Sequence, residues 1–385
     1  MKKNPLTQSG LFTFRVLLTF TLCSAAVFFA LLSFGKTPRT DKLFEHSTPA
    51  SGEQTASADL APSTPTGPGI PRYYNYAPGP GIGEAAGEPS IGFNPSSGKA
   101  MYLAGLQTLQ VTLPEKITPL GSVPKACDAA WADVSFTGTR VRSADPILFT
   151  DQGTGRTFVS QLNTVTQTSP VLIGLNSLMA FTDDDGATWT PAQVNPPDGS
   201  NDHETVGGGP YPAALSSLSN SLNKGHAVYY CGQGGYVLAL TSIAYCSRSD
   251  DGGLNFGKSI PAYTDAASGC SQAIHGHVKV APDGTVYLPN AQCGGGQAVA
   301  VSTDAGTTWT VHTVPGSHSP AGATDIIDPS VAVSKDAPVA PATSNTMYFA
   351  YAGAVGSDNR MFVTVTKDRG MTWSTPVDVG TSLGI

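Results

Sequence analysis

One short pattern recurs four times in the chain: serine or threonine, any residue, aspartate, any residue, glycine, any residue, commonly threonine, and an aromatic residue. The copies are TDDDGATW (182–189), SDDGGLNF (249–256), STDAGTTW (302–309) and TKDRGMTW (366–373). Their aromatic positions are 53 to 67 residues apart. A pattern that returns at a regular distance marks a repeated structural unit, whereas a catalytic motif usually occurs once. The chain is therefore expected to fold as an array of similar units.

The residue types of the pattern are those of a tight turn. An aspartate or hydroxyl side chain accepts hydrogen bonds from backbone N–H groups nearby, glycine supplies a positive φ, and the aromatic ring packs on a hydrophobic layer. A calcium loop of the EF-hand kind needs a glutamate six residues after its glycine, and no copy has one. We interpret the pattern as structural, with these key residues: Asp184, Gly186, Trp189, Asp251, Gly253, Phe256, Asp304, Gly306, Trp309, Asp368, Gly370 and Trp373.

Composition favours short strands joined by many turns. The 385 residues include 43 Gly and 30 Pro, and only 13% are charged, which is unlike a bundle of charged amphipathic helices. The net charge is −7, and only 21 Lys and Arg are spread over the chain. A nucleic-acid partner is not expected, because phosphate binding requires clustered cations. The expected fold class is all-β.

Two segments precede the repeats. Basic residues lead into an uncharged apolar run at 16–34, which is about long enough to cross a hydrocarbon layer. We interpret 1–34 as an export signal, either a cleaved signal peptide or an uncleaved membrane anchor. Residues 35–86 are rich in Pro, Ser, Thr and Gly and are predicted to be a disordered tether. The protein is expected to be extracytoplasmic, either secreted or anchored.

Export makes the cysteines informative, because an oxidising compartment permits disulfides. Cys231 with Cys246 and Cys270 with Cys293 each flank strand-like runs within one repeat, so we predict these two disulfides. Cys127 is left over and is expected to be a buried thiol. No spacing of Cys and His residues indicates a zinc site.

The four turns resemble the Asp-box, or BNR repeat, of sialidases and related β-propellers. The resemblance covers about residues 87–385 and implies four-stranded blades, with each box between the third and fourth strands on the outer part of the propeller. Five repeats are visible, and the first has no clear box. Sialidase propellers have six blades, so we expect six in the complete protein and a C-terminal truncation here. A ring closed by five blades is the alternative.

The innermost strand of each propeller blade lines the central channel. At equivalent positions near the start of this strand the five repeats carry ionisable residues: Glu88, Asp145, His203, His277 and Asp328. Residues far apart in sequence would then form one ring, able to bind a cation, hold sugar hydroxyls or perform acid–base catalysis. The structural alternative is that these polar residues only hydrate the channel.

His275 and Glu204 are secondary candidates beside this ring. Alternation along a regular strand places His275 on the same side as His277, and Glu204 on the side opposite His203. Simple solvent exposure of His275 and Glu204 is the alternative interpretation.

The resemblance to sialidases implies an exo-glycosidase, which uses three arginines, a tyrosine nucleophile assisted by glutamate, and an aspartate acid/base. The Arg-Ile-Pro tripeptide that usually holds the first arginine is missing. Outside the boxes, the arginines that could face the channel are Arg140, Arg142, Arg156 and Arg360.

Two functions therefore stay open. The first is a sialidase-like glycan-processing enzyme with Asp145, Glu88 and His203 as catalytic candidates. Its candidates for substrate binding are His277, Asp328, His275, Glu204 and Arg142. The second is a non-catalytic propeller that binds a glycan, a cation or a protein at the cell surface. No cofactor is required by either, although a cation such as calcium could occupy the channel. The membrane is a further partner if residues 1–34 stay attached.

Overall fold

The computed structural model describes residues 76–83, 88–114, 129–141, 145–164, 174–194, 202–234, 243–263, 269–270, 275–318, 328–356 and 358–383. All of them belong to one compact unit, Thr64–Ile385. The predicted export signal, most of the predicted tether, Cys127 and Arg142 lie outside the described residues.

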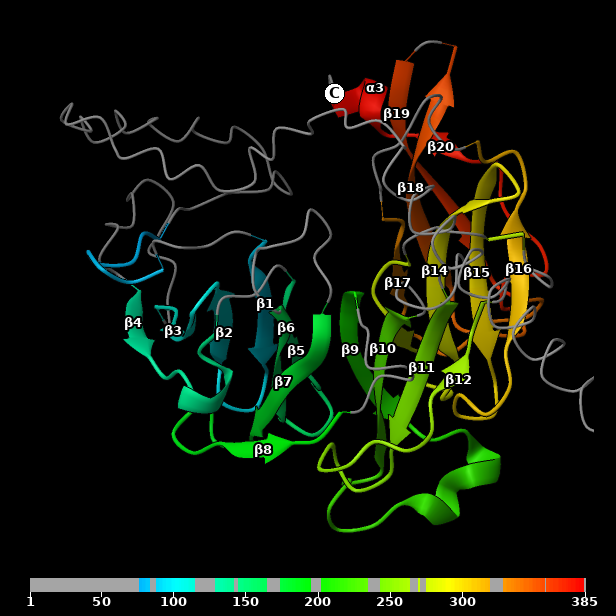
Figure 1. Ribbon diagram of the computed structural model, residues 1–385. Coiled ribbons are helices and arrows are strands. Elements are labelled where there is room, and N and C mark those ends of the chain that lie inside the picture. The colour runs from blue at the N-terminus through cyan, green and yellow to red at the C-terminus, as the bar shows by residue number, and fades with distance from the viewer. Residues whose placement is uncertain are drawn as a thin grey trace, which may run out of the picture. The chain divides into compact units, whose positions relative to one another are not determined.

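The described residues form five four-stranded antiparallel sheets, and each sheet is made of four consecutive strands (Figure 1). In chain order the sheets are β1 (Ser90–Asn94), β2 (Lys99–Ala104), β3 (Gln107–Thr112) and β4 (Ala130–Asp133); β5 (Pro146–Thr150), β6 (Thr157–Thr164), β7 (Gly174–Thr182) and β8 (Thr190–Ala192); β9 (Asp202–Pro210), β10 (His226–Gly234), β11 (Ile243–Ser249) and β12 (Ile260–Pro261); β13 (Lys279–Val280), β14 (Val286–Cys293), β15 (Gly296–Ser302) and β16 (Thr310–Val314); and β17 (Ser330–Val333), β18 (Met347–Val355), β19 (Asp358–Thr366) and β20 (Val377–Asp378). The all-β fold of four-stranded propeller blades is confirmed.

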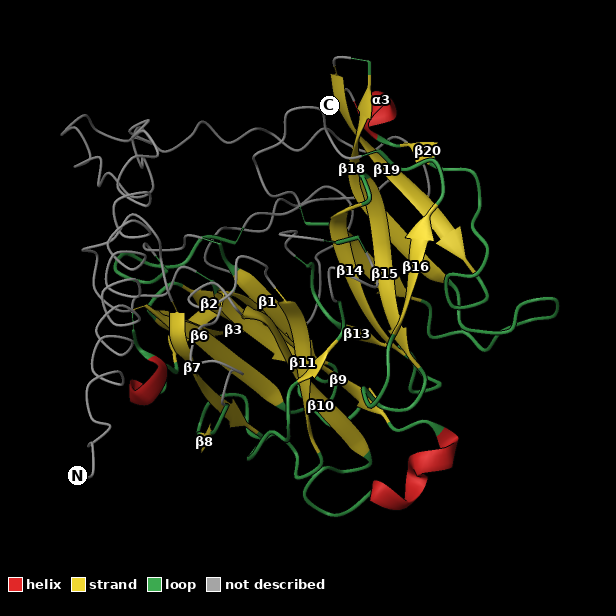
Figure 2. Cartoon of the chain, turned by 45° about the vertical axis from the view of Figure 1, so that its right-hand side comes forward, coloured by secondary structure: helices red, strands yellow, loops and turns green. Residues whose placement is uncertain are grey.

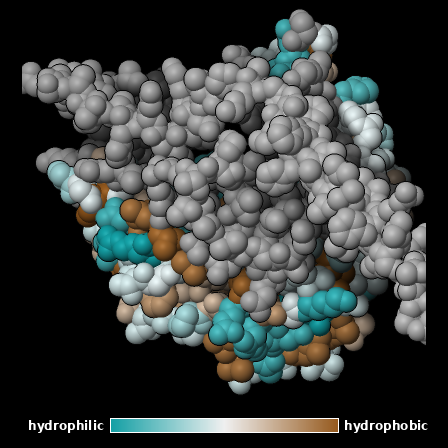
Figure 3. All heavy atoms as spheres, viewed as in Figure 1, coloured by the Kyte–Doolittle hydropathy of each residue, from teal (hydrophilic) through white to brown (hydrophobic). Residues whose placement is uncertain are grey.

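In the described residues, helical structure is minor and lies outside the sheets (Figure 2). There it comprises the 3₁₀ turns η2 (Thr137–Thr139) and η3 (Ala213–Leu218) and one turn of α-helix, α3 (Gly380–Leu383). In the part of the chain that the structure describes, no helix has the length and apolar character needed to span a membrane. Hydrophilic and hydrophobic side chains are interspersed along the lower edge of the face seen in Figure 3.

Successive sheets pack face to face through their first strands, since β1 contacts β5, β5 contacts β9, β9 contacts β13 and β13 contacts β17. A separate hydrophobic cluster fills each of these four interfaces. A strand buried on both faces needs apolar residues throughout, and β10 is buried along almost all of its length. The third and fourth sheets approach closely at Gly207, where a Cβ atom would lie 2.7 Å from the carbonyl oxygen of Val278. The glycines of β9 thus serve sheet packing.

The four repeated turns share one hydrogen-bond network. In the fourth sheet the Asp304 carboxylate accepts bonds from Ser302 Oγ (2.8 Å), Thr308 N (2.9 Å) and Thr308 Oγ1 (2.6 Å), while Gly306 N donates to Ser302 Oγ (2.8 Å). The same bonds recur around Asp184, Asp251 and Asp368, with an asparagine side chain replacing threonine at Asp251. Each turn connects the third and fourth strands of its sheet.

Each turn also fastens its sheet to the preceding one. Its aromatic residue packs in the cluster between the two sheets, as Trp189 does beside Met101 and Trp309 beside Tyr229. In three turns, the backbone carbonyl of the residue directly before the glycine of the pattern accepts a hydrogen bond from a side chain of the preceding sheet. The pairs are Gln110 Nε2 to Asp185 O (2.8 Å), Arg156 Nη1 to Gly252 O (2.6 Å) and Arg248 Nη1 to Ala305 O (2.8 Å). The turns therefore hold neighbouring sheets together.

Both predicted disulfides are present. Cys231 and Cys246 face each other on β10 and β11, and their Cα atoms are 4.1 Å apart. Cys270 is bonded to Cys293 at the end of β14, with a Cα–Cα distance of 4.0 Å. Each bridge lies within the unit whose spacing predicted it.

Candidate functional site

The five ionisable residues at the starts of the sheets line one cavity of about 300 Å³, which we call the axial cavity. Each lies at the beginning of the first strand of its sheet, and successive first strands contact one another. Glu204 and the segments Pro89–Ser90 and Pro146–Ile147 complete the lining. Side chains separated by up to 240 residues in the sequence thus share one concave surface, as expected where equivalent strands surround an axis.

The carboxyl side chains of Glu88 and Asp145 form a hydrogen bond in this cavity. Such a bond requires that one carboxyl keep its proton. Burial raises the pKa of Glu88 to about 7, with further contributions from the charge of Asp145 and from this hydrogen bond, while nearby His203 opposes the rise. The pKa of Glu88 therefore lies near neutral pH, where the carboxyl pair can hold a proton.

His203 connects three sheets across the cavity. Its Nε2 lies 2.8 Å from Asp328 Oδ2, and its backbone N–H donates to Asp145 Oδ2 at 3.2 Å. The backbone φ of His203 is 50°, in the left-handed region that non-glycine residues rarely adopt. A strained residue held by several partners is typical of functional sites, where the surrounding structure enforces the conformation.

Glu204 faces away from His203, as expected: the His203 ring packs against His277, which precedes β13, whereas Glu204 points toward β6, although both residues line the axial cavity. The pairing of β9 with β10 is irregular here: Thr205 faces Cys231 and Asp202 faces Gln233, so two residues of β9 oppose one of β10. Such a bulge leaves the extra residue without a partner on the neighbouring strand. Glu204 is also not solvent-exposed, since only 1% of its surface is accessible, and Ser160 Oγ donates to its Oε1 at 3.3 Å.

His277 and His275 occupy different environments. His277 lines the cavity, and its Nδ1 lies 3.1 Å from Thr205 Oγ1. Burial lowers the pKa of His277 to about 4, and the positive charge of Lys279 lowers it further. His275 is fully buried, so the alternative of simple solvent exposure is wrong for it too. Its ring packs edge-on against His203 at 5.5 Å between centroids, and its Nδ1 donates to Gly276 O at 2.9 Å. Burial, with a contribution from His203, lowers the pKa of His275 to about 3. Both rings are therefore neutral at pH 7.

The arginines expected to face the channel pair elsewhere. Arg156 binds Asp183 (2.7 Å), Arg140 binds Asp133 (3.2 Å) and Arg360 binds Asp378 (3.1 Å). None of these three arginines lines the axial cavity, so the prediction that they could face the channel is wrong. Each forms an ion pair with a carboxylate outside the cavity instead. Within the described ranges, no group of three or more His, Cys, Asp or Glu side chains is placed to hold a metal ion.

Thr205 was not identified from the sequence, although it contacts His277 in the cavity wall. It lies two residues after His203, and both side chains contact His277. Alternation along the strand from His203 is the sequence signal that could have identified it.

No family model matches the chain, and no curated protein matches it in sequence. Among solved structures it is similar to a Hadza microbial sialidase, with 16% identity over 76% of this chain and 58% of that one and a TM-score of 0.43. An intramolecular trans-sialidase from Ruminococcus gnavus has 14% identity, with 76% and 84% covered and a TM-score of 0.39. A fucose-specific lectin from Aleuria aurantia has 12% identity, with 76% and 78% covered and a TM-score of 0.40. The chain spans less than two thirds of the first of these proteins.

Proposed function

We propose that the protein is a glycan-processing enzyme that cleaves a glycosidic bond in the axial cavity, with Glu88 as the general acid. The observation that carries this proposal is the Glu88–Asp145 carboxyl pair, in which the pKa of Glu88 is raised to about 7 by burial and by Asp145. An acid whose pKa lies near the working pH is both protonated and able to give up its proton.

In this reaction Glu88 donates its proton to the glycosidic oxygen as the bond from carbon to that oxygen breaks. Asp145, now without a shared proton, stabilises the positive charge that develops on the sugar ring. A water molecule adds to the sugar carbon and gives one proton to the Glu88 carboxylate. The acid is thereby regenerated, and one water is consumed for each bond cleaved.

The remaining groups of the cavity support binding of a ligand with many hydroxyls. Asp328, Glu204 and the neutral ring of His277 offer oxygen or nitrogen atoms that accept hydrogen bonds. The ion pair of His203 with Asp328 orients the carboxylate that faces the ligand. We therefore propose a neutral sugar as the substrate, with Asp328, Glu204, His277 and Arg142 as substrate-binding candidates and His275 as a buried support for His203.

We also propose that the protein acts outside the cytoplasm. Its two disulfides are stable in an oxidising compartment. The basic and apolar N-terminal segment fits export, with or without retention in the membrane.

The test is a panel of chromogenic neutral glycosides together with a fluorogenic sialoside. We expect turnover of at least one neutral glycoside, and a decrease of kcat/KM by about 10²- to 10⁴-fold for Glu88→Gln, the usual contribution of a general acid. Asp336→Asn, which alters an exposed carboxylate outside the cavity, is the control and should retain full activity. Glycan binding without turnover of any substrate would instead assign the cavity to a lectin-like protein.

A further inference from the structure

A second cavity, of about 210 Å³, lies between the third and fourth sheets, and we call it the rim cavity. Its lining comes from β10, β11, the segment between β11 and β12, and the repeated turn between β15 and β16. It shares no lining residue with the axial cavity. The rim cavity is thus a separate place on the molecule.

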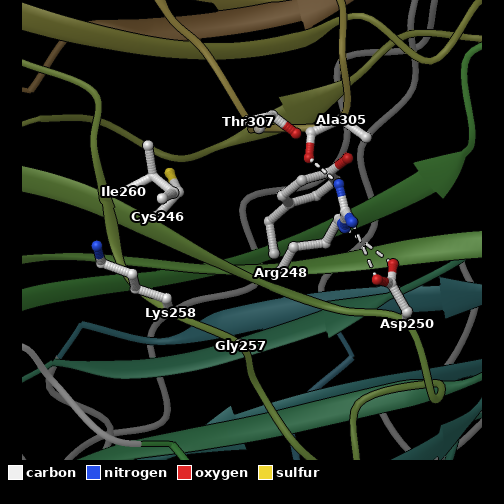
Figure 4. A pocket seen from close by; sticks show the side chains of 10 residues that line it. Cys246, Arg248, Asp250, Gly257, Lys258, Ile260, Ala305 and Thr307 are labelled. Carbon is white, nitrogen blue, oxygen red and sulfur yellow. Dashed lines mark hydrogen bonds and ion pairs between the residues drawn. The ribbon is translucent and has the colours of Figure 1, made fainter.

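Arg248 is held rigidly in this cavity. Figure 4 shows its guanidinium between Asp250 and Ala305: Nη2 donates to Asp250 Oδ2 at 3.0 Å, and Nη1 donates to Ala305 O at 2.8 Å. These two bonds use one N–H of each nitrogen, so both Nη1 and Nη2 retain a second N–H. Asp250 is fixed in turn by the Tyr211 hydroxyl, which donates to it at 2.8 Å. A donor fixed in advance loses little conformational entropy when it binds a ligand.

Tyr229 supplies an independent indication of a ligand. Its side chain is fully buried and lines the cavity, and among the described residues nothing accepts a hydrogen bond from its hydroxyl. Burial raises the pKa of Tyr229, and Asp250 adds to the rise while Arg248 opposes it. The phenol therefore keeps its proton. A buried donor without an acceptor is unusual in folded proteins and calls for a partner of the opposite kind.

A second cation lines the cavity. Lys258 is exposed and lies on the opposite side of the cavity from Arg248 in Figure 4, whereas the Thr307 hydroxyl already donates to Asp304 O at 2.9 Å. Cys246, in its disulfide, and Ile260 provide an apolar surface between these charged ends. Two cations face one carboxylate here, although the protein as a whole carries a net charge of −7.

A similar arginine bridge between sheets exists without such a cavity. Arg156 binds Asp183 through its guanidinium and donates to Gly252 O, as Arg248 does with Asp250 and Ala305. The cavity beside Arg156 has a volume of only about 10 Å³. Bridging two sheets therefore does not require the open space beside Arg248.

We propose that the rim cavity binds the carboxylate of a small organic acid about the size of one sugar ring. The carboxylate accepts hydrogen bonds from Arg248 and from the Tyr229 hydroxyl, Lys258 adds positive charge, and the ring of the ligand covers Cys246 and Ile260. Two sources share this chemistry: an acidic sugar at the end of a glycan, and a free apolar carboxylic acid.

The experiment measures binding of glucuronate, glucose and cyclohexanecarboxylate to the full chain by calorimetry or ligand-observed NMR. We expect both carboxylates to bind with a Kd on the order of 1 mM, usual for ligands this small, and glucose not to bind. Stronger binding of glucuronate identifies an acidic sugar as the source, and stronger binding of cyclohexanecarboxylate identifies a free acid.

Tyr229→Phe is the decisive variant, because it removes one oxygen and keeps the shape of the core. We expect it to weaken carboxylate binding about fivefold or more, since a buried hydrogen bond to a charged group is lost. Tyr287→Phe is the matched control: Tyr287 occupies the same register position in the next sheet, is equally buried, and lies outside the rim cavity. Its carboxylate binding should equal that of the unaltered protein.

Lys258→Glu gives a second readout on an exposed residue that the fold does not need, and it should weaken binding about tenfold through charge reversal. Unchanged carboxylate affinity in both Tyr229→Phe and Lys258→Glu would overturn the proposal. So would the absence of saturable binding by either carboxylate. Asp145→Asn, which alters only the axial cavity, should leave rim binding intact, so this test stands apart from that of the proposed enzyme activity.

Discussion

The repeated turn makes a quantitative prediction about stability, tested most simply in the fourth sheet with Asp304→Ala. This change removes three hydrogen bonds at 2.6 to 2.9 Å, two from Thr308 and one from Ser302. We take about 1 kcal/mol of net stabilisation for each bond, which is below the usual value for a charged acceptor because this carboxylate is only partly buried. The free energy of unfolding should then fall by about 3 kcal/mol. Asp304→Asn keeps one acceptor oxygen and should lose about half of that.

The assay is unfolding in urea, followed by tryptophan fluorescence, for which Trp309 in the same turn is a local probe. Thr303→Ala is the matched control, because Thr303 is exposed beside Asp304 and its side chain contributes nothing to the network. Its stability should change by less than about 0.5 kcal/mol. If Asp304→Ala behaves like Thr303→Ala, the turn is not the structural fastening described here.

Three further predictions follow from the described contacts. At Asp251, Asp304 and Asp368 burial opposes ionisation, but the hydrogen bonds that each carboxylate accepts outweigh it and lower its pKa below 3.8. The stability that these bonds add is present above pH 3.8 and is lost as the pH falls further. An acid titration followed by circular dichroism will detect this loss. The raised pKa of Glu88, about 7, makes kcat/KM fall as pH rises through that value, and a pH profile flat up to pH 9 would contradict the assignment of the acid. Because His203 has a φ of 50°, His203→Val should destabilise by about 1 kcal/mol more than His203→Asn in thermal unfolding, since asparagine tolerates this conformation and a β-branched residue does not.

Much of the architecture could be predicted from the sequence because the turn is a local device. Asp304 and Gly306 form their hydrogen bonds with residues four positions away, so the turn can be predicted from a short stretch of sequence. Its recurrence then aligns the repeats with one another. That alignment placed Glu88, Asp145, His203, His277 and Asp328 at equivalent points, and the structure brings them to one cavity.

The failures arise where partners are distant in sequence. The bulge at His203 depends on how β9 pairs with β10, and alternation along a single strand cannot reveal an extra residue. The pairing of Arg156 with Asp183 depends on how β6 pairs with β7, and the burial of His275 against His203 depends on two sheets meeting. The rim cavity could not be predicted from the sequence, because its lining residues come from two different repeats and no motif joins them.

The central claim is that Glu88 shares a proton with Asp145 at neutral pH, and its most direct test is an NMR titration of the Glu88 carboxyl carbon. The chain has only six glutamates, so selective ¹³C labelling yields few signals, and Glu88→Gln assigns the relevant one by its disappearance. The predicted midpoint is about 7, and Asp145→Asn should shift it downward because the neighbouring charge is gone while burial persists. A midpoint near the ordinary value of 4.5, unchanged by Asp145→Asn, would contradict the account.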